Sequence, residues 1–231
     1  MAKEKSVRSV KTGPVSTPSA VSRVSDVDLV AVSAHIARTD PAFAKLIDHV
    51  GPCEITSNRD GSIFESLAYS VVAQQLSTKA ADTIGGRLVE LVGSPLTAEA
   101  IAACSAEALR GVGLSGSKTK TLLGLAHVAL DGSIDLTALW DLPDEEVHRQ
   151  LTALWGIGRW TAEMTMIFNM GRLDVWPVGD LAVRKGWGII HRMEMSPTAE
   201  QIESMADHLR PYRSVVAWYC WRATDTKDMD W

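Results

Sequence analysis

The segment Leu151 to Asp180, LTALWGIGRWTAEMTMIFNMGRLDVWPVGD, decides the fold of this 231-residue chain. Before its Gly156-Ile157-Gly158 turn, Pro143 is followed by three acidic residues and then by apolar residues at helical spacing, which is typical of an amphipathic helix. After the turn, small and apolar residues continue from Trp160 to Gly171, and that glycine suits a left-handed helix cap. The two helices are therefore predicted to meet in a tight hairpin.

The glycines of this hairpin let its backbone adopt positive φ values and approach another surface closely. The second helix points free N–H groups and the positive end of its dipole outward from the turn. Such an end suits a phosphate group, although an ordinary helical hairpin shows the same Gly-x-Gly pattern.

A lone carboxylate follows the second helix. The residues Val175 to Asp180, VWPVGD, break the helical pattern, and Leu181 begins another, so Asp180 is expected at or near a helix N-cap. Aspartate caps helices routinely, and the position by itself indicates no activity. It is compatible with catalysis, because the helix dipole that favours a capping carboxylate also keeps it ionised.

These features together resemble the helix-hairpin-helix DNA glycosylase superfamily, and within it the AlkA-type 3-methyladenine DNA glycosylases. The pattern L-x-G-I-G-x-W-T-A from Leu154 onward, followed by Pro-x-Gly-Asp, carries the resemblance. Upstream, Leu67 to Ala81 is similar to the helix and Gln-Gln-x-Ser turn of these enzymes, and Arg210 to Trp221 resembles their C-terminal helix. The similarity covers roughly residues 26–222. The β-rich N-terminal domain of the larger AlkA-type enzymes has no counterpart in this sequence, and in this respect the chain resembles the shorter, single-domain members.

The rest of the chain also shows helical rather than strand-like periodicity. Further helices are predicted over residues 63–76, 78–91, 97–109, 117–130 and 198–209. The predicted fold class is all-α, with two helical subdomains and a central cleft. One subdomain would comprise residues 62–170 with the hairpin, the other residues 26–61 and 171–231, and residues 1–25 are predicted to be a disordered basic arm.

The net charge of −5 argues at first sight against a nucleic-acid partner, since phosphate contacts supply most non-specific affinity. Residues 1–25 carry +4, however, and the remaining residues therefore carry −9. An acidic body can still bind DNA when backbone N–H groups and a few cations form its binding face. The predicted partner is double-stranded DNA with a damaged base, bound by a monomer with strongly salt-dependent affinity.

Other classes are excluded by composition. No apolar run approaches the ~18 residues of a membrane helix, so no membrane partner is expected. Cys53, Cys104 and Cys220 lie far apart and match neither a zinc site nor the four-cysteine iron–sulfur site of some relatives. The six histidines lack metal-ligand spacing, so no divalent metal is expected. No organic cofactor is expected either. This cysteine usage favours a reducing, intracellular location, in the cytoplasm or the nucleus.

Tryptophan provides eight of the fourteen aromatic residues. Core packing is the ordinary role of a single Trp, but several beside a carboxylate indicate a stacking pocket. Purines alkylated at N3 or N7 are cationic, and an indole face attracts a cation by about 0.5–2 kcal/mol. The residues assigned to this base pocket are Trp160, Trp221, Trp218, Trp176 and Gln74, of which the resemblance favours the first two.

The resemblance implies three further sets of residues. The plug that fills the gap left by a flipped nucleotide would be Gln75 with Leu76, although a polar helix end has the same sequence. The hairpin residues assigned to phosphate binding are Gly156, Ile157, Gly158 and Thr161. The main-chain carbonyls assigned to a hairpin Na⁺ or K⁺ ion are those of Thr152, Leu154 and Ile157.

The mechanism follows from the chemistry of the expected lesion. A flipped cationic base is already a good leaving group, so the enzyme must chiefly stabilise positive charge developing on the sugar. The ionised carboxylate of Asp180 does this, and it can also orient or deprotonate water. In bifunctional relatives a lysine occupies the position of Trp160 and attacks the sugar. A tryptophan there predicts a monofunctional glycosylase that leaves an abasic site.

Two alternatives remain beside an alkylbase DNA glycosylase. One is a glycosylase for deaminated, oxidised or mismatched bases, because pocket shape decides the lesion and the sequence does not show it. The other is a non-catalytic DNA-binding module that kept the hairpin, which the presence of Asp180 in its turn argues against.

Overall fold

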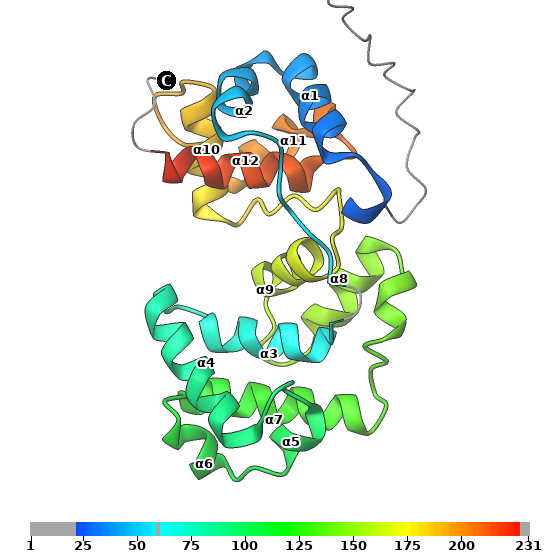
Figure 1. The fold of residues 1–231 in the computed structure, drawn as a ribbon, viewed down its shortest axis with the longest axis vertical. Helices are drawn as coiled ribbons and strands as arrows, with labels where there is room; N and C mark the ends of the chain where they lie inside the picture. The colour runs from blue at the N-terminus through cyan, green and yellow to red at the C-terminus, as the bar shows by residue number, and fades with distance from the viewer. Residues whose placement is uncertain (1–21, 59–60, 227–231) are drawn as a thin grey trace, which may run out of the picture.

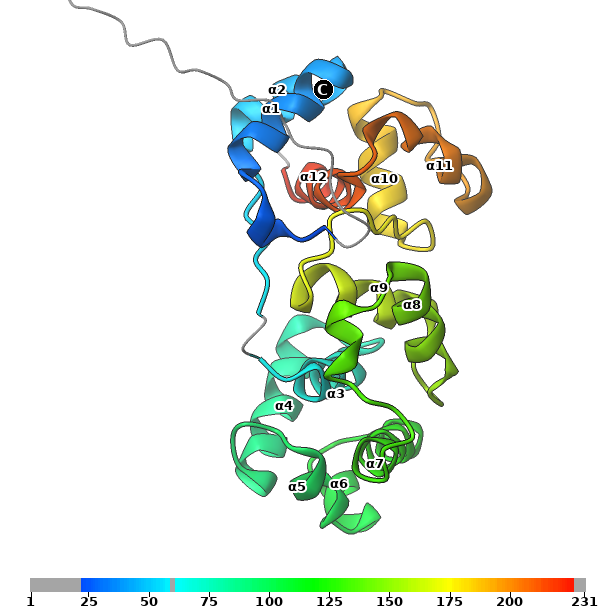
Figure 2. The ribbon, with the colours of Figure 1, turned by 90° about the vertical axis from the view of Figure 1, so that its right-hand side faces the viewer.

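The computed structural model describes residues 22–58 and 61–226, whose helices form two groups stacked one above the other (Figures 1 and 2). The described residues contain no β-strand, only an isolated bridge between Arg23 and Arg172. The predicted all-α class with two helical subdomains is confirmed. No helix in the described ranges is long and apolar enough to span a membrane.

The upper group in Figure 1 consists of segments from both ends of the chain. Its helices are α1 (Leu29–Thr39), α2 (Ala44–Val50), α10 (Leu181–Ile190), α11 (Ala199–Met205) and α12 (Arg213–Asp225). The helices α10 and α12 pack closely at Gly186, where an added Cβ would lie 2.0 Å from the carbonyl oxygen of Cys220. A glycine is required there, because a side chain would clash with the backbone of α12, and backbone atoms cannot move aside as the end of a flexible side chain can.

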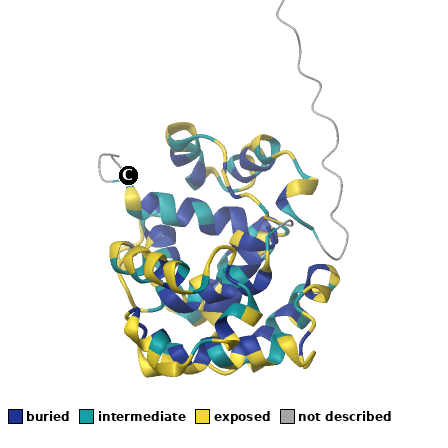
Figure 3. Ribbon diagram, turned by 60° about the horizontal axis from the view of Figure 1, so that its bottom comes forward, coloured by how far each residue is buried: buried dark blue, intermediate teal, exposed yellow. Residues whose placement is uncertain are grey.

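The lower group is continuous in sequence. Its helices are α3 (Ile63–Ala73), α4 (Thr78–Val92), α5 (Ala98–Ala102), α6 (Ala106–Gly111), α7 (Gly116–Leu130), α8 (Asp144–Ala153) and α9 (Arg159–Met164). Helix α3 packs against α4, α7 and α9, and α8 and α9 adjoin the upper group (Figures 1 and 2). Buried residues face inward, while exposed residues follow the outer faces of the helices (Figure 3).

A buried arginine supports the place where the chain returns to the upper group. The guanidinium of Arg172, fully buried, donates to the carbonyl oxygens of Leu139, Trp140 and Leu142 at 2.9–3.0 Å. It also lies 3.2 Å from the carboxylate of Asp144. These contacts tie the segment before α8 to the start of the loop that leads to Asp180.

The predicted N-terminal arm lies largely outside the described residues. Residues 22–25, which the prediction included in it, instead pack on the body. The N–H of Val24 donates to the carbonyl of Gly171 at 2.8 Å, and the Arg23 side chain donates to the carbonyl of Trp140. Val24 is buried. For residues 22–25 the prediction of a disordered arm is therefore wrong, because contacts distant in sequence hold them.

Several helix boundaries also differ from the predicted ones. Helix α3 ends at Ala73 rather than residue 76, and the segment 97–109 divides into α5 and α6, because Ser105 caps a new helix by accepting from Ala108 N–H. The helix after the hairpin changes to a π-helical turn at Thr165–Asn169 before ending at Gly171, whose φ is +64°. The spacing of apolar residues in the sequence does not reveal such a turn.

Candidate active site

Asp180 occupies the N-cap of α10, as predicted. Its Oδ1 accepts from the backbone N–H groups of Ala182 at 2.8 Å and Val183 at 3.0 Å. The Asp180 N–H in turn donates to the Pro177 carbonyl at 2.9 Å. This hydrogen bond closes the turn Pro177–Asp180, which positions the carboxylate. The half-buried Asp180 thus has its carboxylate oriented by the helix that follows it.

Two indole groups contact this carboxylate from opposite helical groups. Trp160 Nε1, on α9, donates to Asp180 Oδ2 at 2.7 Å, and Trp221 Nε1, on α12, donates to Oδ1 at 3.3 Å. Trp160 is 43% exposed, so its ring is accessible to a ligand. Every contact named for the carboxylate is made by an N–H donor, which fits an ionised acceptor.

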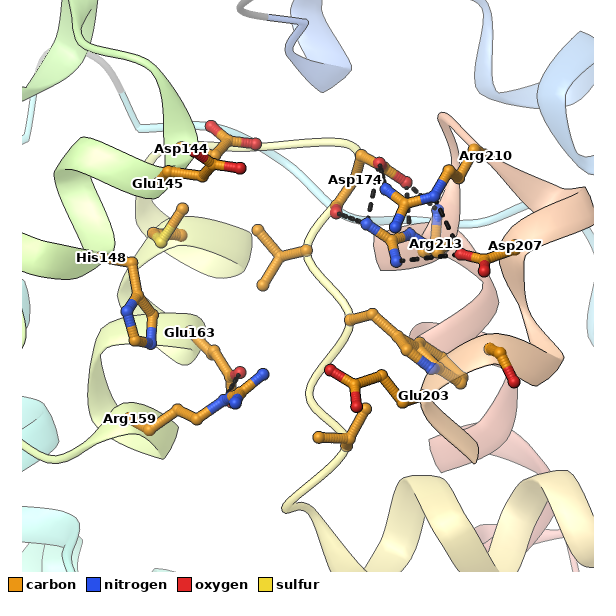
Figure 4. A pocket seen from close by; sticks show the side chains of 15 residues that line it. Asp144, Glu145, His148, Arg159, Glu163, Asp174, Glu203, Asp207, Arg210 and Arg213 are labelled. Atoms are coloured by element: carbon orange, nitrogen blue, oxygen red, sulfur yellow. Dashed lines mark hydrogen bonds and ion pairs between the residues drawn. The ribbon is translucent and has the colours of Figure 1, made fainter. Parts of the chain in front are cut away.

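The loop before Asp180 is anchored to the start of α12. Arg213 donates to both carboxylate oxygens of Asp174, at 2.8 and 2.9 Å, and Arg210 donates to the same carboxylate at 2.8 Å (Figure 4). The hydroxyl of Ser214 accepts from Val175 N–H at 2.9 Å. The same contacts therefore fix the loop and the helix that carries Trp221.

A charged cavity of about 460 Å³ lies between the two helical groups beside this loop (Figure 4). Glu163, only 3% exposed, lines it and accepts from Arg159 Nε at 2.8 Å. Burial raises the pKa of Glu163, and the charge of Asp180 adds to this effect, while Arg159 lowers it. Asp180 is absent from the described residues that line this cavity.

Phe168 is a candidate pocket residue that the sequence analysis missed. It lies in the π-helical turn, is 47% exposed, and its ring centre is 5.3 Å from that of Trp221, with the planes tilted by 35°. A π-turn redirects side chains and is frequent at functional sites. The sequence carries no signal for it, because regular helical spacing was assumed through this segment.

The other predicted pocket tryptophans differ from each other in position. Trp218 is half-buried, with its ring edge-on to Tyr219 and near Arg222. Trp176 is only 5% exposed, its N–H donates to the Ile202 carbonyl at 2.9 Å, and its ring packs on Trp187. The assignment of Trp176 to the base pocket is therefore corrected: it is a core residue.

The two hairpin glycines, Gly156 and Gly158, differ in their surroundings. Gly156 has φ +81°, and an added Cβ would lie 2.0 Å from Thr121 Oγ1 on α7, so this residue packs against the lower group. Gly158, the N-cap of α9, has nothing within 4 Å of an added Cβ and therefore faces open space. Open space and the free N–H groups at a helix start suit an approaching anion.

Two hairpin residues predicted to bind phosphate are engaged elsewhere. The N–H of Ile157 donates to the Leu154 carbonyl at 3.1 Å, and the Ile157 side chain is buried. Thr161 is 3% exposed, and its hydroxyl accepts from the amide of Gln74 at 3.2 Å. The phosphate assignment of Ile157 is corrected, because both its N–H and its side chain are engaged within the protein. The backbone N–H of Thr161 lies in the first turn of α9, so its contact with phosphate stays a prediction.

The predicted plug residues form an exposed turn after α3. Gln75 has φ +57°, an uncommon conformation for a residue other than glycine, and both Gln75 and Leu76 are exposed. Gln74 Nε2 also donates to the Gly156 carbonyl at 3.1 Å, which joins this turn to the hairpin. The predicted pocket role of Gln74 stays a prediction.

The chain matches a family of known proteins. Residues 68–211 match the family model described as "HhH-GPD superfamily base excision DNA repair protein". The chain belongs to the HhH-GPD superfamily. The resemblance inferred from the sequence is thereby confirmed for this HhH-GPD protein.

The relatives of this HhH-GPD protein cover most of its length. It is 31% identical to "DNA-3-methyladenine glycosylase 1" of Schizosaccharomyces pombe, over 87% of this chain and 90% of that protein. The structure of S. pombe 3-methyladenine DNA glycosylase (Mag1) in complex with abasic DNA aligns with a TM-score of 0.77 and 32% identity, covering 87% and 99% of the two chains. A DNA-3-methyladenine glycosidase from Bacillus halodurans aligns with a TM-score of 0.74 and 34% identity, covering 83% and 88%.

We expect Trp160→Phe to lower the single-turnover rate of base release roughly 10- to 100-fold, because it removes a hydrogen bond to a charged acceptor. The matched control is Trp176→Phe, which removes an indole N–H from the core instead. That variant is expected to lower the free energy of unfolding by about 1–3 kcal/mol and leave the rate unchanged. The reverse pattern would show that the wrong indole has been assigned to the site.

Proposed function

We propose that this HhH-GPD protein is a monofunctional DNA glycosylase that flips alkylated purines, of the 3-methyladenine and 7-methylguanine type, out of duplex DNA and releases them hydrolytically. The observation that carries the proposal is the Asp180 carboxylate, which accepts hydrogen bonds from the indole N–H groups of both Trp160 and Trp221. The names of the relatives reported above agree with this substrate class.

The reaction uses the carboxylate as an electrostatic stabiliser. The N-glycosidic bond breaks, and its electron pair leaves with the cationic base, which becomes neutral. Positive charge then develops on the sugar, and the carboxylate of Asp180 stabilises it. Water adds to the anomeric carbon and loses a proton, to Asp180 or to solvent, which leaves an abasic site. No leaving-group acid is needed, because the lesion already carries the charge.

The aromatic side chains provide the base pocket. Trp160 and Trp221 contact Asp180, and the exposed ring of Phe168 packs against Trp221. Indole faces attract cations. Such a pocket selects bases that are flat, apolar at the edges and positively charged. Neutral lesions, which need a proton on departure, would react more slowly.

The hairpin and the turn after α3 complete the DNA-binding face. Gly158 and the start of α9 would hold a phosphate, and Gln75 with Leu76 would fill the space left by the flipped nucleotide. The carbonyls of Thr152, Leu154 and Ile157, in the last turn of α8 and the hairpin after it, would hold a Na⁺ or K⁺ ion. Of these, the Leu154 carbonyl also accepts from the N–H of Ile157 at 3.1 Å. Such an ion would add positive charge beneath the phosphate.

The proposal is tested by measuring base release from duplexes that carry 3-methyladenine, 7-methylguanine, 1,N6-ethenoadenine or hypoxanthine. We expect fast release of the two cationic bases, and no covalent adduct when borohydride is added during the reaction. If only the neutral bases were released, the substrate of the enzyme would be a different class of lesion. A borohydride-trapped adduct would show a lyase, and no release at all would leave only a DNA-binding module.

A further inference from the structure

A lysine from another helix caps the end of α3. Lys118 Nζ, on α7, donates to the Val72 carbonyl at 2.8 Å. Val72 lies in the last turn of α3, where carbonyls lack intrahelical partners, and cationic side chains stabilise such helix ends. Lys118 is half-buried, and burial lowers its pKa. Its ammonium group is thus held in a specific contact rather than freely solvated.

The turn that follows this helix end is strained and fastened at a second point. Gln75 has φ +57°, and such a conformation persists only where the surroundings enforce it. On the hairpin side, Gln74 Nε2 donates to the Gly156 carbonyl at 3.1 Å and to Thr161 Oγ1 at 3.2 Å. The turn is therefore held by α7 on one side and by the hairpin with α9 on the other.

We propose that Lys118 and Gln74 are positioning residues for base flipping. They keep the Gln75-Leu76 tip at a set place relative to the hairpin, so that docking of the hairpin on the DNA backbone brings the tip to the base stack. This inference rests on the plug role given to Gln75 and Leu76 in the proposed function.

A direct phosphate contact is the competing role for Lys118. Lys118 directs one of its three N–H groups to a carbonyl of the protein, a contact that a purely phosphate-binding role does not require. The neighbouring Lys120 differs: it is exposed and lies over the ring of Trp155, 4.2 Å from the ring centre. Lys120 is therefore a matched control, because it carries the same charge on the same helix without touching the turn.

The experiment compares two duplexes with the same 7-methylguanine, one opposite cytosine and one opposite an abasic-site analogue, where flipping requires less unpairing. Release is measured in single turnover at saturating enzyme. We expect Lys118→Met to slow release roughly 10-fold from the duplex with cytosine opposite the lesion, called the paired duplex. Release from the duplex with the abasic-site analogue should slow by less than about threefold. Lys118→Arg should restore most of the rate, and Lys120→Met should leave both rates within twofold. Equal losses on both duplexes, or no loss on either, would overturn the inference.

Two further sets of variants test the other contact of the turn and the plug residues themselves. Gln74→Leu breaks the hairpin side of the clamp and should show the same duplex-selective loss, which provides a second test if Lys118→Met folds poorly. If Gln75→Ala and Leu76→Ala leave the paired duplex unaffected, the plug assignment in the proposed function is wrong, and the inference fails with it. If those two variants slow the paired duplex but Lys118→Met and Gln74→Leu do not, only the inference is wrong.

Discussion

Asp180→Asn is expected to lower the single-turnover rate of 7-methylguanine release by roughly 10²- to 10⁴-fold, the range for loss of a group that stabilises charge or accepts a proton in the transition state. The substitution removes the negative charge that stabilises the sugar while keeping a side-chain oxygen for the N–H groups of Ala182 and Val183. Asparagine caps helices about as well as aspartate, so the fold should be kept. Affinity for damaged DNA should not fall, because no positive charge is lost.

The matched control is Asp28→Asn. Asp28 caps α1 by accepting from Val30 N–H at 2.9 Å, so the same chemical change is made at a helix start outside the proposed site. Its rate of base release should equal that of the unmodified protein. If Asp180→Asn retained activity within tenfold of that control, the catalytic role of Asp180 would be wrong.

Gly156→Ala is expected to lower the free energy of unfolding by roughly 2–5 kcal/mol. An alanine at φ +81° costs about 1–2 kcal/mol, and a Cβ 2.0 Å from Thr121 Oγ1 and 2.9 Å from Thr121 Cβ adds an overpacking cost of about 1–3 kcal/mol. The hairpin would move away from α7, and DNA binding would be lost with it. Urea unfolding and DNA binding measured on one preparation test both effects.

Gly158→Ala separates the two roles of the hairpin. Its backbone has φ −85° and nothing lies within 4 Å of an added Cβ, so stability should change by no more than about 1 kcal/mol, the cost of alanine at an N-cap. DNA affinity should still fall, because the methyl group would project where a phosphate approaches. Unchanged DNA affinity in this variant would contradict the phosphate role of the hairpin.

The helices around the site could be predicted from the sequence because their signals are local. Capping by Asp180, the turn at Gly156 and the end at Gly171 each depend on residues within about one helical turn. The resemblance added Trp160 and Trp221, and the structure places both indole N–H groups on Asp180. Their proposed contacts with a flipped base stay a prediction.

The errors in the site arose from packing, which short patterns do not report. Trp176 has the composition of a pocket residue, yet its ring fills the core against Trp187. The N–H of Ile157, predicted to bind phosphate, instead donates to the Leu154 carbonyl. Phe168 was missed because a π-helical turn changes the direction of side chains without altering the residue types.

Local sequence signals were enough to establish the all-α class, the hairpin and the helix cap at Asp180. The resemblance added the meaning of Trp160, which stands where bifunctional relatives carry a lysine. Only the tertiary structure decided which side chains meet that carboxylate. Trp221 lies 41 residues from Asp180 and reaches it because Gly186 lets α10 and α12 approach to backbone contact. Lys118 likewise reaches the end of α3 across 46 residues. Capping and helical periodicity act within a few residues, whereas such contacts depend on how closely whole helices pack.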